Sequence, residues 1–411
     1  MQGSAFRQSI ALLGTRRFGT FWFASLLANI GTWAQQVAQP WLLLSLGASP
    51  FLLGLDAFAL GAPVLLLTLV GGALADRADR RRTIAFFQSI QMLCPVLLVV
   101  LLLTGTVQPW VVIALSLVVG VTDALSMPSF QSIVPSIVER EQIPAGIALN
   151  TTQFNLSRIL GPALAGVLMA SVGLAGAFAV NAVSYLPFIL VALWVLPRTG
   201  PAQPGAGRID RRQLWASVRE VVREPGLRGA LLTVFVTASL CAPLITFCPV
   251  LVKEVFQGGA GQFSTALGAF GVGGLIGAAG LLAVHPRRDR RPLSTWFAVG
   301  YGVIVMLAAL NRWAWGLPVL LMLAGVAMTA SNASANALLQ SSAPARIRGQ
   351  TVSLFMLAMR GGMGLGSLVT GAAVHQLGVR EALLLNGILA VLLHLAVGRA
   401  WRNASLPKLL D

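Results

Sequence analysis

Twelve long apolar runs constrain this chain more than any other feature of its sequence. Each holds about 20 residues, the length that a helix needs to cross a bilayer core of roughly 30 Å. Backbone polar groups in lipid must be satisfied within the chain, so runs of this length are predicted to be helices. The expected fold class is therefore an all-α polytopic membrane protein with twelve transmembrane helices. The runs lie at 18–46, 51–75, 83–104, 109–134, 148–171, 174–196, 228–252, 263–284, 293–311, 315–340, 350–374 and 380–400.

The composition excludes a water-soluble protein. Of the 411 residues, 56% are hydrophobic and only 10% are charged, whereas soluble domains carry about a quarter charged residues. A net charge of +16 would indicate nucleic-acid binding in a soluble chain, but here the arginines gather in alternate loops, so we expect no nucleic acid. Cys94, Cys241 and Cys248 lie in apolar runs and are expected to be buried free thiols. The scattered histidines indicate no metal site.

The loops between the runs differ in positive charge. One alternating set of loops holds 23 Lys and Arg residues, and the other holds only Lys253, Arg312 and Arg380. Because cytoplasmic loops carry the excess of Lys and Arg, we expect both termini in the cytoplasm. The predicted location is the bacterial cytoplasmic (inner) membrane, crossed many times.

The long middle loop divides the chain. We expect an N-terminal six-helix half over 1–197, a cytoplasmic linker over 198–227, and a C-terminal six-helix half over 228–411. Arginines and apolar residues alternate at helical spacing over 208–223, which predicts an amphipathic helix on the lipid surface. The two halves echo each other at offsets of about 200 to 210, in pairs that include Asp79-Arg80-Arg81 with Asp289-Arg290-Arg291, Arg158 with Arg360, and Asn181 with Asn386.

The segment between the second and third runs, 71–82, is highly charged. Six of the seven residues over 76–82 are charged, so we predict a short loop at the membrane surface. Gly72-Ala73-Leu74-Ala75-Asp76-Arg77, followed by Arg80-Arg81, resembles the signature loop of the major facilitator superfamily, with Asp79 where that signature has Gly. The resemblance implies two six-helix halves around a midplane site and a gating role for the loop residues, which are Gly72, Asp76, Arg77, Arg80 and Arg81.

The fifth run contains a stripe of small residues. Ser157, Gly161 and Ala165 lie one turn apart, which favours close helix packing, and the glycines of the eighth run, such as Gly273 and Gly277, are a predicted partner. The same stretch resembles the antiporter motif of drug-exporting facilitators. That resemblance implies that a kink here seals the outer interface between the halves, through Gly161, Pro162 and Gly166.

Further stretches narrow the resemblance to one branch. Residues 33–41, 47–50, 133–135 and 148–150, together with the run from Arg158 to Gly166, resemble the enterobactin-exporter and macrolide-efflux branch of the superfamily. The resemblance covers nearly all of the first half, whereas the second half matches mainly by its pattern of spans.

Four ionisable residues fall inside spans, where each costs roughly 2.5–3.5 kcal/mol near a helix centre. Asp123 is the first candidate for a proton carrier, and the alternative is a static ion pair with Arg158. Asp56 is the second candidate, although it lies near the outer end of its run and could reach water. Arg158 and Arg360 occupy equivalent places in the halves. They suit a structural or gating role as well as substrate binding, in which case they would attract an anionic group.

Polar and aromatic residues of the first, fourth, seventh and tenth spans are predicted to line a substrate cavity. Each alone is as well explained by packing or by a hydrogen bond between helices. The candidates are Asn29, Trp33, Gln36, Thr122, Phe235, Thr246, Ser331, Asn332 and Asn336.

The function expected is a secondary active transporter that exports an amphipathic drug, siderophore or metabolite in exchange for protons by alternating access. The expected energy source is the proton gradient, with no cofactor and no enzyme activity, because no triad, metal cluster or P-loop lysine is present. The expected partners are a small amphipathic substrate and the lipid bilayer, and the chain is expected to be a monomer. Two alternatives stay open, namely a transporter that flips lysolipid and a receptor or scaffold without flux.

Overall fold

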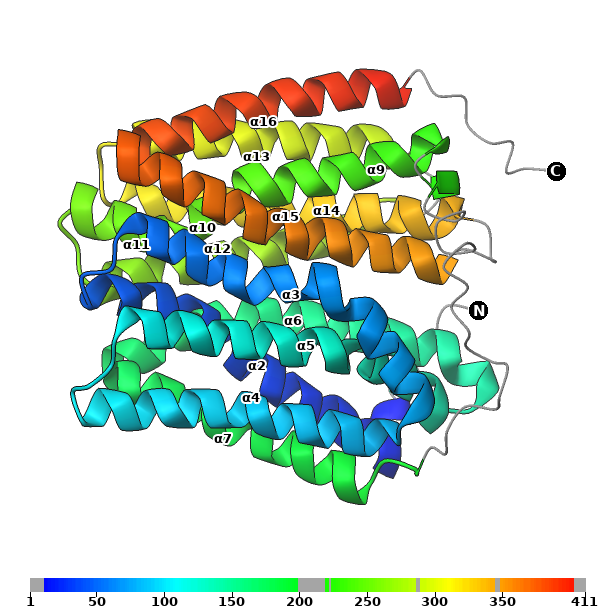
Figure 1. Cartoon of the computed structure of the whole chain (residues 1–411). Coiled ribbons are helices and arrows are strands. Elements are labelled where there is room, and N and C mark those ends of the chain that lie inside the picture. Colours follow the sequence, from blue (N-terminus) through cyan, green and yellow to red (C-terminus); the bar gives the residue numbers. More distant parts are fainter. Residues whose placement is uncertain (1–10, 199–218, 222, 286–288, 344–347, 403–411) are drawn as a thin grey trace. The chain divides into compact units, whose positions relative to one another are not determined.

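A computed structural model describes residues 11–198, 219–221, 223–285, 289–343 and 348–402. These residues form helices and no strand (Figure 1). The first six expected spans are α2 (Arg16–Ser45), α3 (Pro50–Arg77), α4 (Arg80–Leu103), α5 (Pro109–Ile137), α6 (Ile143–Ser171) and α7 (Gly173–Trp194). A short 3₁₀ turn, η1 (Arg140–Gln142), precedes α6.

The other expected spans follow the linker. The seventh combines α9 (Pro225–Val236), η2 (Thr237–Cys241), α10 (Pro243–Thr246), α11 (Cys248–Val250) and η3 (Leu251–Val255). The last five are α12 (Ala260–Leu282), α13 (Arg291–Leu310), α14 (Gly316–Ser342), α15 (Arg348–Leu377) and α16 (Val379–Arg402). The all-α polytopic fold is thereby confirmed, with a helix at every predicted run.

Eleven helices of the described residues are long and apolar enough to cross a membrane. Helix α2 occupies the place of the first expected span but is not one of these eleven. The reason lies in its sequence, because its middle carries Asn29, Gln35, Gln36 and Gln39. A span with this many polar groups is expected to face protein or a water-filled cavity rather than lipid.

The chain divides into two compact units, which are described separately. Unit 1 comprises Met1–Leu42 and Pro63–Arg208, and unit 2 comprises Leu43–Ala62 and Ile209–Asp411. The division within α3 falls at Pro63, a residue that lacks a backbone N–H and interrupts the helical ladder. The division into halves at 197 and 228 stays a prediction. The surface helix expected over 208–223 lies outside the described residues, apart from 219–221 and 223.

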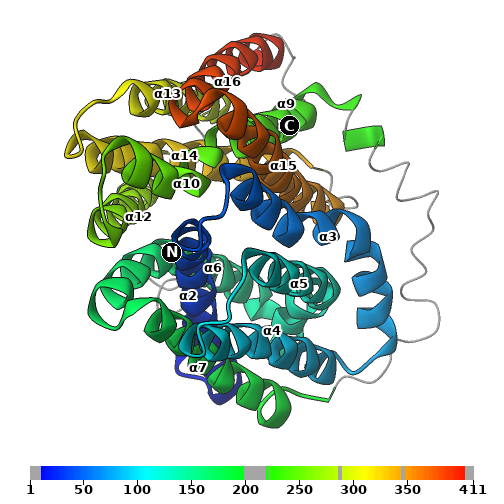
Figure 2. The ribbon, with the colours of Figure 1, turned by 60° about the vertical axis from the view of Figure 1, so that its left-hand side comes forward.

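Unit 1 is built around an aromatic core. Helix α4 packs against α5 and α7, and α6 packs against the same two helices (Figures 1 and 2). The rings of Phe21, Phe130 and Phe188 meet with centroids 5.5 to 5.8 Å apart. Such tilted ring pairs add stabilisation beyond the apolar area that they bury. The core ties α2, α5 and α7 together.

In unit 2, several helices pack closely where one of them has a glycine. Helix α12 packs on α14, and α13 packs on both α14 and α16. A Cβ atom at Gly229 of α9 would lie 2.7 Å from the ring of Trp401, which is 2% exposed. The segment of α3 that belongs to unit 2 crosses α15 closely, since a Cβ at Gly54 would lie 3.2 Å from the Cα atom of Gly371.

The seventh span is the most irregular helix. Segments η2 and η3 are π-helical, with Ala242 N–H donating to the Thr237 carbonyl and Phe256 N–H to the Leu251 carbonyl, each at 3.1 Å. Pro243 and Pro249 lie between the two segments and remove donors from the regular ladder. Single π-helical turns of this kind are frequent at functional sites.

Candidate functional site

The connection between α3 and α4 is shorter than the loop predicted over 71–82. Helix α3 runs to Arg77 and α4 begins at Arg80, so Gly72 and Asp76 lie in helix rather than in a loop. Close packing extends α3, because a Cβ atom at Gly71 would lie 2.5 Å from the carbonyl oxygen of Ala124 on α5. The side chains of Asp76 and Arg77 lie outside the described part of the chain.

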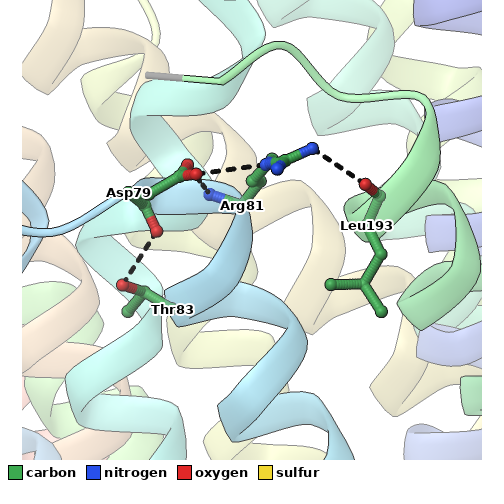
Figure 3. Close-up of polar contacts among 4 residues, drawn as sticks. All are labelled: Asp79, Arg81, Thr83 and Leu193. Carbon is green, nitrogen blue, oxygen red and sulfur yellow. Dashed lines mark hydrogen bonds and ion pairs between the residues drawn. The ribbon is translucent and has the colours of Figure 1, made fainter. Parts of the chain in front are cut away.

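Asp79 occupies the turn and caps α4 (Figure 3). Its carboxylate accepts the backbone N–H of Arg81 at 3.2 Å and the Arg81 Nε–H at 3.1 Å, and its carbonyl accepts the Thr83 hydroxyl at 3.2 Å. This capping role accounts for an aspartate at position 79, where the signature loop that the sequence resembles has glycine. A carboxylate satisfies otherwise unpaired N–H groups at the start of a helix. Arg81 also donates through Nη1 to the Leu193 carbonyl at the end of α7, at 2.9 Å.

The same arrangement recurs in unit 2. Asp289 accepts the backbone N–H of Arg291 at 2.9 Å and its Nε–H at 3.4 Å, and Arg291 donates through Nη1 to the Trp401 carbonyl of α16 at 3.2 Å. In both units, then, an Asp–Arg clamp ties the start of one helix to the end of another. This matches the sequence echo between residues 79–81 and 289–291. A cationic group is also favourable at a helix C-terminus, where carbonyls lack partners.

Three of the predicted cavity residues lie along α2. Asn29, Trp33 and Gln36 are all half-buried and lie three or four residues apart, so they share one helix face. The Trp33 ring meets that of Phe154 on α6 edge to face, with centroids 5.9 Å apart. The structure thus places an aromatic pair among amide side chains in unit 1.

Gly161 is the point at which α6 approaches α2. A Cβ atom there would overlap the Cβ of Trp33 and lie 3.0 Å from the Ala34 backbone nitrogen. Pro162 and Gly166 are buried beside it. The predicted packing role of the small stripe fits this contact, which α6 makes with α2 inside unit 1. Gly273 and Gly277 pack instead against the α14 backbone, because both belong to the tight α12–α14 pair.

The two candidate carboxylates lie in different units. Asp123 is half-buried in the middle of α5, and its charge acts on Tyr185 of α7. Asp56, in the α3 segment of unit 2, is only 6% exposed, so the expectation that it reaches water was wrong. Arg158 and Arg360 are half-buried, each in the middle of its helix.

The remaining cavity candidates differ in their surroundings. The hydroxyls of Thr122 and Ser331 are engaged in helix contacts, donating respectively to the Val118 carbonyl at 3.0 Å and the Ser294 carbonyl at 3.0 Å. Phe235 is 39% exposed. Thr246 Oγ1 is 3.3 Å from the Ser367 hydroxyl, Asn336 accepts from Gln340 at 3.1 Å, and the buried Asn332 Oδ1 atom has no hydrogen-bond partner among the described residues.

Sequence reasoning missed a buried polar chain in unit 1. Asn181 Nδ2 donates to Gln35 Oε1, Gln35 Nε2 donates to Gln39 Oε1 at 3.1 Å, and Gln39 Nε2 donates to the Ser116 hydroxyl at 2.6 Å. The chain links α7, α2 and α5. The two glutamines one turn apart in the first apolar run were a visible signal, because such groups are rare in spans and need partners.

A buried histidine was also missed. His394 of α16 is 1% exposed, and its Nε2 atom lies 3.3 Å from the Thr237 hydroxyl in η2. Its Nδ1 atom has no hydrogen-bond partner among the described residues. The signal was a histidine in the middle of the twelfth apolar run.

The described residues also bear on the sequence expectations for a metal site and for the cysteines. No group of three His, Cys, Asp or Glu side chains there is placed to hold a metal ion. Cys94, Cys241 and Cys248 are free and buried, which confirms the expectation for them.

Comparison with known proteins covers almost the whole chain. Residues 7–409 match the profile of the family described as "Transmembrane secretion effector". The chain is 28% identical over 395 residues to the multidrug efflux pump Tap of Mycolicibacterium fortuitum, covering 90% of this chain and 94% of Tap. It is 24% identical over 411 residues to the enterobactin exporter EntS of Salmonella typhimurium, covering 98% of each.

Two further similarities carry less information. One relative matches only part of the chain, and one solved structure is similar in fold but low in sequence identity. The staphyloferrin A transporter of Staphylococcus aureus is 26% identical over 261 residues, so the match spans 62% of this chain and 64% of that transporter. Among solved structures, a bacterial homologue of the lysosomal transporter Spinster, in an inward-facing conformation, superimposes with a TM-score of 0.71 at 15% identity and covers 98% of this chain and 99% of its own. That likeness supports the fold alone.

Proposed function

Because the chain belongs to the transmembrane secretion effector family of the major facilitator superfamily, we propose that it is a proton-coupled exporter of an amphipathic drug, siderophore or related metabolite. That it is a multi-pass membrane transporter follows from the family. The narrower proposal is supported by the relatives named as a multidrug efflux pump, an enterobactin exporter and a staphyloferrin A transporter. Transport proceeds by alternating access, in which the two six-helix halves open a midplane site to each side in turn.

The proposed substrate face lies on α2. Asn29 and Gln36 carry amide groups on the helix face that also holds Trp33, whose ring pairs with that of Phe154. Sites for small molecules combine apolar and aromatic surface with a few polar groups that fix orientation. An amphipathic molecule matches this mixture better than a simple ion or sugar does.

The proposed proton carrier is Asp123, and its position is the observation that carries the proposal. It is the only ionisable residue of α5, half-buried at mid-helix. An ionisable residue within a span is a functional site by default, because its charge is costly there. A carrier must change its charge between the two access states, which a half-buried carboxylate is able to do. No cofactor is required, and we propose a monomer with both termini in the cytoplasm.

A flux assay tests this function. Purified protein in vesicles with an acidic lumen is offered enterobactin, staphyloferrin A and the cationic dye ethidium separately. We expect at least one probe to accumulate as protons leave, and a protonophore to abolish the accumulation. Asp123→Asn should lose accumulation but keep exchange without a gradient. The proposal fails if no probe responds to the pH gradient, or if Asp123→Asn accumulates a probe as wild type does.

A further inference from the structure

A tyrosine of α7 and a threonine of the proposed substrate helix form a pair of hydroxyls in contact. The Tyr185 hydroxyl of α7 is 2.9 Å from the Thr32 hydroxyl of α2, and Thr32 is placed to donate to the Ala28 carbonyl at 2.9 Å. Tyr185 is only 3% exposed, so no bulk water competes for its hydroxyl. Thr32 is the residue next to Trp33, on the helix that carries the proposed substrate face.

Few charges surround this pair. The ionisable groups close enough to influence Tyr185 electrostatically are Asp123 of α5 and Cys94 of α4. Helix α6, which also packs on α7, carries Arg158 as its only ionisable residue. Helix α2 contributes Thr32 and has arginines only at its start. Cys94 is a buried free thiol, so Asp123 is the acid whose charge the pair experiences.

Each hydroxyl has one proton, which restricts the possible hydrogen-bond arrangements. If Thr32 donates to the Ala28 carbonyl, Tyr185 must donate to Thr32. If Thr32 donates to Tyr185, the Tyr185 proton is free to point elsewhere, and the Ala28 carbonyl loses its side-chain donor. The pair therefore has two discrete states that differ in the direction of both O–H bonds.

The charge on Asp123 biases the choice between these states. A nearby negative charge favours the state in which the Tyr185 O–H dipole turns toward it, and the low dielectric of a buried site strengthens that effect. Protonation of the carboxyl removes this bias and changes the balance between the two states. The change reaches α2, because the Thr32 hydroxyl donates to Tyr185 in one state and to the backbone of its own helix in the other.

We propose that Tyr185 and Thr32 are positioning residues that convey the protonation of Asp123 to helix α2 and thereby to its substrate face. This inference rests on the proposed function, because it takes Asp123 as the proton carrier. Asp123 does not have to touch the substrate in this scheme. Proton and substrate bind at separate places in unit 1, and the hydroxyl pair couples them.

The chain offers a clean probe, because it contains only two tyrosines, Tyr185 and Tyr301. A Tyr301→Phe protein labelled with ¹³Cζ-tyrosine has a single ring resonance, from Tyr185. We expect this resonance to follow a one-proton titration, which Asp123→Asn abolishes and Cys94→Ala leaves unchanged. A Tyr185 resonance that does not respond to pH, or that titrates equally in Asp123→Asn, overturns the inference.

The second measurement follows the signal into α2. The indole ¹⁵N–H resonance of Trp33, assigned by its loss in Trp33→Phe, should shift with the same midpoint as Tyr185. Tyr185→Phe and Thr32→Val should each abolish the shift, whereas Thr32→Ser, which keeps the hydroxyl, should preserve it. Two different variants guard against a folding defect in one of them. A Trp33 titration that survives in both overturns the inference.

The flux assay separates this inference from the proposed function. If Asp123→Asn loses gradient-driven accumulation while Tyr185→Phe transports and titrates as wild type does, Asp123 is the proton carrier but the hydroxyl pair is not its relay. If Asp123→Asn accumulates the probe as wild type does, the proposed function itself fails.

Discussion

Removing the arginine of the first clamp should loosen unit 1 and leave unit 2 unaffected. Arg81 joins the Asp79 cap of α4 to the Leu193 carbonyl of α7, and the Arg81 and Asp79 side chains are 13% and 22% exposed. A hydrogen bond from a charged group contributes about 1.5–3 kcal/mol, and a partly exposed ion pair about 0.2–1 kcal/mol. Allowing for solvent screening, we expect Arg81→Met to cost about 2 kcal/mol. That corresponds to a fall in melting temperature of about 4–8 °C for a unit of this size.

The buried cysteines allow each unit to be followed separately. Cys94 lies in unit 1, whereas Cys241 and Cys248 lie in unit 2, and all three are free and at most 3% exposed. A dye that fluoresces on reacting with thiols therefore reports unfolding of unit 1 in a protein that keeps only Cys94. A protein that keeps only the other two cysteines reports unfolding of unit 2.

The expected result is a selective shift. Arg81→Met should lower the temperature at which Cys94 becomes reactive and leave the unit 2 thiols unchanged, and Arg291→Met should do the reverse. Arg82→Met is the matched control, because Arg82 is the exposed neighbour of Arg81 and should cost little. The reasoning is refuted if Arg81→Met and Arg82→Met give the same Cys94 transition.

Three further substitutions test other contacts. Gly161→Ala should destabilise unit 1 by about 1–3 kcal/mol, because its methyl group would overlap Trp33, and an unchanged Cys94 transition would contradict the α2–α6 contact. Gln39→Leu breaks the buried chain between α2 and α5 and should cost about 1–3 kcal/mol in the same assay, whereas a neutral result would mean that the chain stabilises nothing. Thr237→Val leaves His394 without its hydroxyl partner, so the unit 2 thiols should react at a lower temperature, while Thr237→Ser should behave as wild type.

The fold could be predicted from the sequence because lipid leaves few choices. An apolar run of about 20 residues in lipid must become a helix. The positive charge of alternate loops predicts which loops lie on the cytoplasmic side. Segment ends were less certain, as at α3, which continues through Asp76 to Arg77. There the pattern of charges predicted a loop, but close packing of Gly71 on α5 extends the helix.

The candidate site was only partly predictable. Asn29, Trp33 and Gln36 were named as cavity candidates because they are polar or aromatic residues of one span, and their spacing of three and four residues places them on one face of α2. Contacts between helices, such as Tyr185 with Thr32 or Gly161 with Trp33, depend on how spans distant in sequence cross. Neither composition nor spacing carries that information. Such contacts determine which polar residues are engaged in packing between helices. The sequence alone could not distinguish those residues from residues that line a cavity.

The central claim is that Asp123 exchanges one proton against the exported molecule, and proton movement itself tests it most directly. Vesicles containing the purified protein and a trapped pH-sensitive dye receive an outward gradient of a probe that the flux assay has shown to be transported. Wild type should acidify the lumen as the probe leaves, and Asp123→Asn should release the probe without acidification. Acidification by Asp123→Asn at the wild-type rate would contradict the account.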